Sequence, residues 1–198
     1  MKLKKIYIYI SFIIFSLTNI TNSYSIEPDV FVQSTVNRAS QVLSDSLSKD
    51  QKIEKLKAIA AETVDIKGIG MYTLGAYRKT LNEDQKKKYE ALFREYFLKT
   101  FSSRLAEYSN PEIQVNSKEK INENYTMVSS ILVATEQRPE INIIWRVYTK
   151  NPDNLRIRDL VIEGLSLART QKEEFASIIK SNEDNIEALF STLKEFVN

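Results

Sequence analysis

One stretch of the chain, from Thr80 to Tyr108, constrains the fold more than any other. Thr80 and Glu83 have the spacing of a capping box, and Asn110-Pro111 closes the stretch because proline cannot continue a helix. These limits predict a helix of about 27 residues, about 40 Å long. Its large apolar side chains recur every three or four positions, the period of one helix face: Tyr89, Leu92, Phe93, Tyr96, Phe97, Phe101, Leu105 and Tyr108. That aromatic face must pack against the rest of the chain, against a ligand, or against both.

Shorter helices are predicted before this one. Apolar residues recur at helical spacing over residues 29–47 and again over residues 50–61, where Ser48 and Gln51 have the spacing of a second capping box. Residues 64–77 contain three of the four glycines of the chain. Glycine inside a helix costs about 1 kcal/mol relative to alanine, so this segment is expected to pack tightly or to bend. It lacks the pattern of a phosphate-binding loop.

The apolar period changes to two after Pro111, which is the period of a β-strand. Four strands are expected, at residues 113–117, 125–133, 141–147 and 155–162, and their short connections make neighbours antiparallel. Helical spacing then returns, with a third capping box at Thr170 and Glu173 and a last helix starting at Asn182 or Asp184. This order predicts an α+β domain with helices packed over one face of a curved four-stranded antiparallel sheet.

The first 25 residues have the layout of a cleaved secretory signal peptide. Three lysines precede about twelve mostly apolar residues, and small residues stand at positions −3 and −1 of a cut after Ser25. The apolar run is short for a membrane span, which needs about 20 residues. We therefore expect residues 1–25 to be removed and residues 26–198 to form one exported domain, in the periplasm of a two-membrane bacterium.

Composition excludes several classes of function. The chain has no histidine and no cysteine, so it has no disulfide, no Ser-His-Asp or Cys-His nucleophile and no ordinary zinc site. Lys2, Lys4 and Lys5 account for three of the 28 Lys and Arg residues, leaving 25 against 26 Asp and Glu in residues 26–198. That near-neutral balance does not favour nucleic-acid binding.

Two carboxylates, Asp159 and Glu163, lie four residues apart on a predicted strand and would point to the same side of it. Such a pair can perform acid–base catalysis where the surroundings separate the two pKa values. Glu163 stands at the strand end, however, so a turn-stabilising or ion-paired role is the simpler interpretation; the candidate partners are Arg156, Arg158 and Arg169. Asp65, ahead of the glycine-rich segment, fits a helix N-terminus.

Three segments follow one another in an order that is similar to a known family. The first runs from Asp65 to Thr73-Leu74-Gly75-Ala76-Tyr77-Arg78. The second is the aromatic helix with Phe93, Phe97, Thr100 and Phe101, and the third runs from Asp159 to Leu167 and is followed by Phe175. Together they resemble the MlaC-type, or "toluene tolerance", family of periplasmic phospholipid-binding proteins.

The resemblance implies an NTF2-like arrangement with a deep apolar cavity between the helices and the sheet. Phospholipid would be bound there as cargo, with no cofactor, no metal and no enzymatic activity. The family carries phospholipid through the periplasm between an outer-membrane lipoprotein complex and an inner-membrane ABC transporter with an MCE-domain protein, and so maintains the lipid asymmetry of the outer membrane. A monomer is expected, with no nucleic-acid partner.

Helix phase and strand alternation indicate which side chains would line that cavity. They are Leu74, Tyr77, Phe93, Phe97, Phe101, Ile131, Ile143, Trp145, Val147, Leu160 and Ile162. Two alternatives remain open at this point. One is a periplasmic NTF2-like enzyme that uses Asp159 and Glu163, and the other is a structural or adhesion module whose core is filled.

Overall fold

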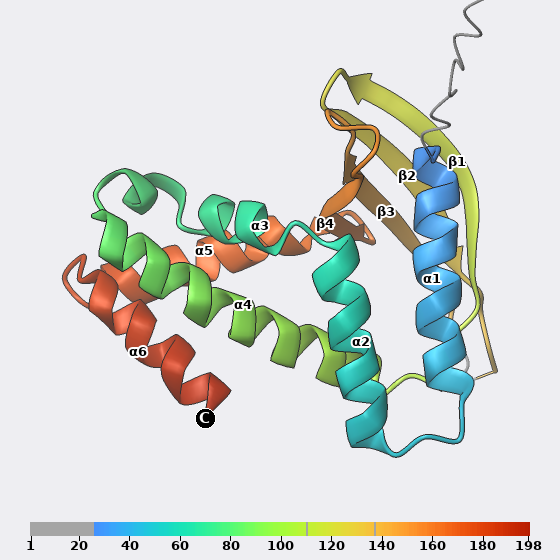
Figure 1. Cartoon of the computed structure of the whole chain (residues 1–198), viewed down its shortest axis with the longest axis horizontal. Helices are drawn as coiled ribbons and strands as arrows, with labels where there is room; N and C mark the ends of the chain where they lie inside the picture. Colours follow the sequence, from blue (N-terminus) through green and yellow to red (C-terminus); the bar gives the residue numbers. More distant parts are fainter. Residues whose placement is uncertain (1–25, 110, 137) are drawn as a thin grey trace, which may run out of the picture.

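The computed structural model describes residues 26–109, 111–136 and 138–198, so the predicted signal peptide lies outside the described residues. The α+β class is confirmed (Figure 1). The elements are α1 (Pro28–Ser44), α2 (Lys49–Thr63), α3 (Ile66–Thr73), the 3-10 helix η1 (Gly75–Lys79), α4 (Glu83–Leu105), β1 (Ile113–Asn122), β2 (Tyr125–Leu132), β3 (Ile141–Tyr148), β4 (Arg156–Ile162), β5 (Leu165–Ser166), α5 (Leu167–Lys180) and α6 (Ile186–Val197).

The sheet has five antiparallel strands in the order β1-β2-β3-β4-β5, not the four that were predicted. The additional strand, β5, is only two residues long. It pairs with β4 because Glu163 and Gly164 both adopt positive φ, 48° and 82°, and reverse the chain at once. Strand β1 also runs past residue 117 to Asn122, through exposed and mostly polar residues that give no apolar alternation.

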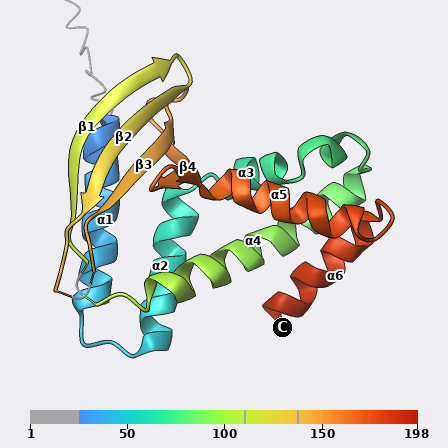
Figure 2. The ribbon, with the colours of Figure 1, turned by 180° about the vertical axis from the view of Figure 1, so that it is seen from behind.

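The helices form two groups around this sheet. Helix α1 packs along β1 and β2, and α2 lies beside it and crosses α4 (Figure 1). Helices α4, α5 and α6 extend away from the sheet, as the reverse view also shows (Figure 2). One continuous cluster of buried apolar side chains joins the groups, from Val32 on α1 through Trp145 on β3 to Phe190 on α6.

Helix α4 begins two residues later than the capping pattern suggested. Its N-cap is Asn82, whose Oδ1 accepts a hydrogen bond from the backbone N of Gln85 at 2.9 Å, while Gln85 Oε1 accepts from the N of Asn82 at 3.1 Å. Thr80 instead donates to the carbonyl of Tyr77. The helix is 23 residues long and ends at Leu105, short of the expected Tyr108.

The other two predicted capping boxes had different outcomes. Ser48 and Gln51 form the box as predicted. The box at Thr170 and Glu173 was wrong, because α5 begins at Leu167 with Ser166 as its cap. A long-range contact decides this start: the backbone N of Ala168 donates to the buried carboxylate of Asp159 at 3.0 Å.

The last helix, α6, also begins later than expected. Its N-cap is Asn185, whose side chain accepts from the backbone N of Glu187 at 3.0 Å. Both Glu183 and Asp184 have positive φ, 57° and 58°. Since right-handed helices need negative φ, neither residue can belong to the helix.

Candidate functional site

The aromatic stripe of α4 divides into a buried half and a half-buried half. Phe93 is 2% exposed, and its ring centroid lies 5.7 Å from that of Tyr89, 6.1 Å from Phe97 and 6.2 Å from Phe175. One turn further on, Phe97 and Phe101 stack on each other at 5.4 Å with an interplanar angle of 11°, and both are only half-buried. The predicted stripe is therefore partly core and partly accessible.

A glycine allows α3 to approach this cluster closely. A Cβ atom at Gly70 would lie 2.8 Å from Cδ1 of Phe93, a separation too short for carbon atoms in contact. The absence of a side chain lets the Phe93 ring lie directly on the α3 backbone. The tight packing predicted for the glycine-rich segment is confirmed here. The bend is found at Gly75, where a φ of +57° separates α3 from η1.

The strand register brings together most of the sheet residues predicted for the site. Ile143, Trp145 and Val147 are buried on one face of β3. Leu160 and Ile162 pair with Trp145 and Ile143, and so lie on that same face, half-buried.

Ile131 does not join that group. It pairs with Asn142, whereas the neighbouring Ser130 pairs with Ile143, so the Ile131 side chain lies on the opposite face of the sheet. The inward residues of β2 are Thr126, Val128, Ser130 and Leu132. Ser130 is tolerated there because its hydroxyl accepts a hydrogen bond from Trp145 Nε1 at 2.8 Å.

Leu74 follows α3 and Tyr77 belongs to η1, and Figure 1 shows that η1 lies at the end of the helical group that points away from the sheet. Leu74 is 1% exposed and belongs to the core. Tyr77 is half-buried, and its hydroxyl donates to Oδ1 of Asp184 at 2.5 Å, which ties η1 to the turn before α6. These two predicted site residues therefore do not meet the sheet residues.

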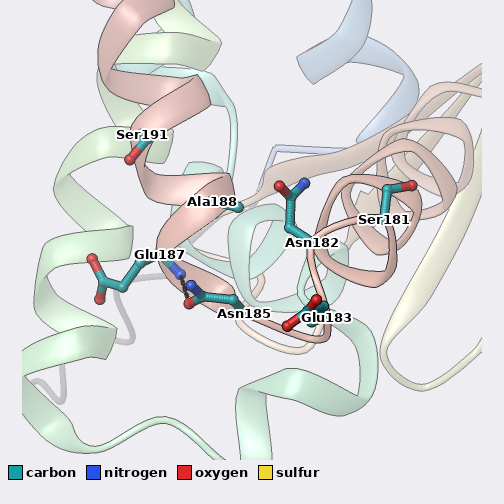
Figure 3. A pocket seen from close by; sticks show the side chains of 7 residues that line it. All are labelled: Ser181, Asn182, Glu183, Asn185, Glu187, Ala188 and Ser191. Atoms are coloured by element: carbon teal, nitrogen blue, oxygen red, sulfur yellow. Dashed lines mark hydrogen bonds between the residues drawn. The ribbon is translucent and has the colours of Figure 1, made fainter.

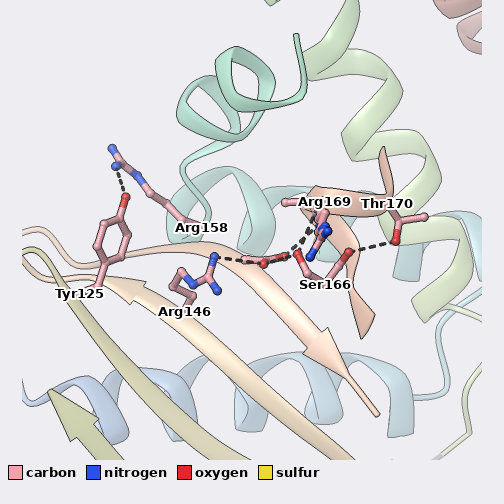
Figure 4. Close-up of polar contacts among 8 residues, drawn as sticks. Tyr125, Arg146, Arg158, Ser166, Arg169 and Thr170 are labelled. Atoms are coloured by element: carbon pink, nitrogen blue, oxygen red, sulfur yellow. Dashed lines mark hydrogen bonds and ion pairs between the residues drawn. The ribbon is translucent and has the colours of Figure 1, made fainter. Parts of the chain in front are cut away.

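Asp159 and Glu163 have separate partners. Asp159 is 4% exposed; its Oδ2 accepts from Ser166 Oγ at 2.6 Å and lies 3.5 Å from Arg146 Nη1, and Figure 4 shows Arg146 and Ser166. Glu163 accepts from the backbone N of Asn142 at 2.5 Å, beside the turn to β5. This arrangement favours the structural interpretation of both carboxylates. The ion-pair partner of Asp159 is Arg146, which the sequence did not indicate.

The helix-capping interpretation of Asp65 is confirmed, with an addition. Its Oδ1 accepts from the backbone N of Gly68 at 2.9 Å, and its Oδ2 pairs with Arg158 Nε at 2.6 Å. Arg158 also donates to the hydroxyl of Tyr125 (Figure 4), and its guanidinium carbon lies 3.7 Å from the ring centroid of Tyr148. Arg158 thus joins the start of α3 to three strands of the sheet.

Two hollows on the described surface are open to solvent and lie outside the space between the helices and the sheet. One, of about 430 Å³, is polar and lies at the turn between α5 and α6 (Figure 3); its lining is Ser181, Asn182, Glu183, Asn185, Glu187, Ala188 and Ser191. The other, of about 360 Å³, lies between α3 and α4; its lining is Ile66, Lys67, Gly70, Lys87, Glu90, Ala91, Phe93 and Arg94. The cavity between helices and sheet stays a prediction.

Within residues 26–109, 111–136 and 138–198, no group of three or more acidic side chains could hold a metal ion. No helix of that same part of the chain is both long enough and apolar enough to cross a membrane.

Tyr89 gives a prediction on pH. Burial raises the pKa of its phenol above the ordinary value, although the hydrogen bond to Thr73 Oγ1 at 2.8 Å opposes the shift. Above about pH 10 the unfolded chain loses this proton while the folded chain keeps it, so the stability is complete below that pH and falls as the pH rises.

Urea unfolding at pH 9 and pH 11 tests this effect. The loss of unfolding free energy between the two pH values should be smaller in Tyr89→Phe than in the wild type. Tyr108→Phe, at a ring 41% exposed, is the control; equal losses in the wild type and Tyr89→Phe would contradict the prediction.

These features define the class of the protein: an α+β protein with an open antiparallel sheet and a long aromatic helix leading away from it. The structure is similar to that of the phospholipid-binding protein from Ralstonia solanacearum, solved in complex with a phospholipid. The TM-score is 0.73 at 20% identity, over 87% of this chain and 97% of the other.

The chain belongs to the MlaC protein family, whose family model matches residues 33–195. It is also 23% identical, over 98% of its own length and 94% of the relative's, to the intermembrane phospholipid transport system binding protein MlaC of Haemophilus influenzae. The family resemblance found in the three sequence segments is thereby confirmed.

Proposed function

We propose that this protein binds a phospholipid and carries it between membranes. The observation that carries this proposal is the stacked pair Phe97 and Phe101, which extends the buried aromatic cluster of α4 to an accessible surface. Family membership and the phospholipid named for both relatives support it. Each acyl CH₂ group gains about 0.8 kcal/mol on leaving water, so a carrier with a dry binding surface removes a large barrier to transfer.

Exposure separates the side chains that would touch the lipid from those that support them. Phe97 and Phe101 on α4 and Leu160 and Ile162 on β4 are half-buried, and we assign the acyl chains to these residues. Five members of the predicted set are fully buried and belong to the core, not to the contact surface; they are Leu74, Phe93, Ile143, Trp145 and Val147. Tyr77 and Ile131 lie elsewhere and are left out of the proposed contact surface.

The cellular role follows from the same proposal. Residues 1–25 would direct export to the periplasm. There the domain would exchange phospholipid with an outer-membrane lipoprotein complex and with an inner-membrane ABC transporter that carries an MCE-domain protein, and so maintain outer-membrane asymmetry. The support is the transport system named for the Haemophilus influenzae relative.

Lipid analysis tests the proposal directly. Protein purified from the periplasm without added lipid should contain phospholipid, detected by native mass spectrometry and by organic extraction. Empty protein should take up phospholipid from vesicles. If the protein is isolated without phospholipid and takes up none from vesicles, the proposed carrier function is overturned. That result would favour a structural module with a filled core.

Phe97→Asn distinguishes binding from folding. The polar amide weakens contact with acyl chains, while the half-buried position limits the loss of packing. We expect lipid retention after gel filtration to fall about fivefold or more, the scale of about 1 kcal/mol, with a smaller effect on urea unfolding than Phe93→Ala has. Leu92→Asn is the matched control, because Leu92 is also half-buried but lies on another side of α4. Equal effects of Phe97→Asn and Leu92→Asn on lipid retention would show that Phe97 is an ordinary core residue with no specific contact to the lipid.

A further inference from the structure

The groove between α3 and α4 combines an apolar floor with a charged rim. The Phe93 ring forms the floor, lying on the α3 backbone at Gly70. Lys67, Glu90 and Arg94 are among the rim residues, and the hollow measures about 360 Å³. The groove therefore opens on one side of the Phe93 ring, and a second neighbour of that ring is Phe97 of the proposed lipid surface, at 6.1 Å between ring centroids.

Charge is unbalanced at this rim. Lys67 Nζ pairs with Glu90 Oε1 at 3.1 Å. Lys87 and Arg94 are exposed, and neither has an ion-pair partner in the part of the chain that the structure describes. The neighbours of Lys87 behave differently: Lys86 pairs with Glu83 at 2.8 Å and Lys88 pairs with Glu187 at 2.7 Å. The groove thus presents two cations without a salt bridge above an apolar floor.

These cations are in line with the accessible aromatic pair. Residues 87, 90, 94, 97 and 101 recur every three or four positions, so they share one side of α4. That side is charged in the N-terminal half of the helix and aromatic in the C-terminal half. Arg94 and Phe101 are separated by about 10 Å along the helix axis. A ligand lying along this side meets positive charge first and aromatic rings next.

We propose that the α3–α4 groove holds the phosphate-bearing headgroup of an anionic phospholipid, with Lys87 and Arg94 as its cationic contacts. The acyl chains leave the groove along Phe97 and Phe101. This inference rests on the proposed carrier function and adds a headgroup preference to it. An arginine fork matches phosphate oxygens in pairs. A zwitterionic headgroup brings its own cation and so gains less from the two rim charges.

The experiment measures lipid uptake from vesicles of phosphatidylglycerol and from vesicles of phosphatidylcholine, with protein separated from vesicles by sedimentation. Wild-type protein should prefer phosphatidylglycerol. Lys87→Gln/Arg94→Gln should lower that preference about tenfold, the scale of two exposed charge pairs. Lys55→Gln/Lys180→Gln is the control, because it removes the same charge at two exposed positions outside the groove and should change neither uptake.

Glu90→Gln should have the opposite effect, because it removes the negative charge of the rim and releases Lys67. We expect the preference for phosphatidylglycerol to rise. Circular dichroism spectra of all variants establish that they are folded.

Failure of this inference and failure of the carrier function have different signatures. If wild-type protein takes up neither lipid, the proposed carrier function is overturned. If it takes up both, and the double variant loses both equally or loses nothing, the headgroup site is overturned. A double variant that loses only vesicle co-sedimentation, with unchanged lipid preference, would assign the two cations to contact with the membrane surface and would also overturn the headgroup site.

Discussion

Phe93→Ala is expected to lower the free energy of unfolding by about 4 kcal/mol, the usual scale for removing a fully buried aromatic ring. The ring is 2% exposed and its centroid lies within 6.4 Å of those of four other rings, on Tyr89, Tyr96, Phe97 and Phe175. Its loss would leave a void between α3 and α4, because Gly70 has no side chain with which to fill it. Urea unfolding followed by circular dichroism measures the change.

A matched variant on the same stripe sets the scale for that result. Phe97→Ala removes the same atoms from a half-buried position, so its loss should be about half as large, in proportion to the apolar area involved. A Phe93→Ala loss below about 1.5 kcal/mol would contradict the assignment of this ring to the core. The two variants together locate the boundary between the core and the accessible surface of α4.

Asp159→Ala is expected to lower the free energy of unfolding by about 3 kcal/mol. The carboxylate accepts from Ser166 Oγ and from the backbone N of Ala168 at 2.6 and 3.0 Å, and both donors would lose their partner in a buried place. Hydrogen bonds to a charged group contribute about 1.5–3 kcal/mol each. The start of α5 should loosen, which hydrogen exchange at Ala168 and Arg169 would report.

Asp159→Asn and Glu195→Ala complete this test. The amide keeps one oxygen that can accept from Ala168, so the loss of stability should be smaller than with alanine. Glu195 is exposed on α6, and its replacement should leave stability within about 0.5 kcal/mol of the wild type. If Asp159→Asn folded with wild-type stability and abolished a turnover, the enzyme alternative would replace the structural interpretation of this carboxylate.

The sequence predicted a helix or strand correctly where the apolar residues of that segment keep one regular period. Helix α4 was predicted because its large apolar residues keep the helical period over several turns, and strands β2 and β3 because theirs alternate. The capping box at Ser48 was predicted correctly because the nearby candidates, Ser46 and Asp50, have no Glu or Gln three residues further on. The boxes at Thr80 and Thr170 failed because another capping residue lies close by, Asn82 in one case and Ser166 in the other. Spacing alone does not rank two such candidates.

The proposed binding surface could likewise be predicted from the sequence only in part. That α4 offers an aromatic face could be read from the sequence, but which rings stay accessible could not. Phe93 and Phe97 are chemically identical and four residues apart. Phe93 is buried by α3, which approaches it at Gly70, and by Phe175 of α5, whereas Phe97 stays half-buried. Accessibility depends on neighbours that are distant in the chain.

The α+β class, the family and the period of the long aromatic helix could all be predicted from the sequence, because they depend on local patterns and on the order of motifs. The phase of β2 could not, because it depends on how the strands pair. Met127 and Ile131 lie on one face of β2, but the buried face is the other one, where Val128 and Leu132 alternate with Thr126 and Ser130. Ser130 can be buried there because the Trp145 indole on the next strand donates a hydrogen bond to its hydroxyl. A polar side chain can be buried when it has such a partner, and that partner is known only once the strands are paired.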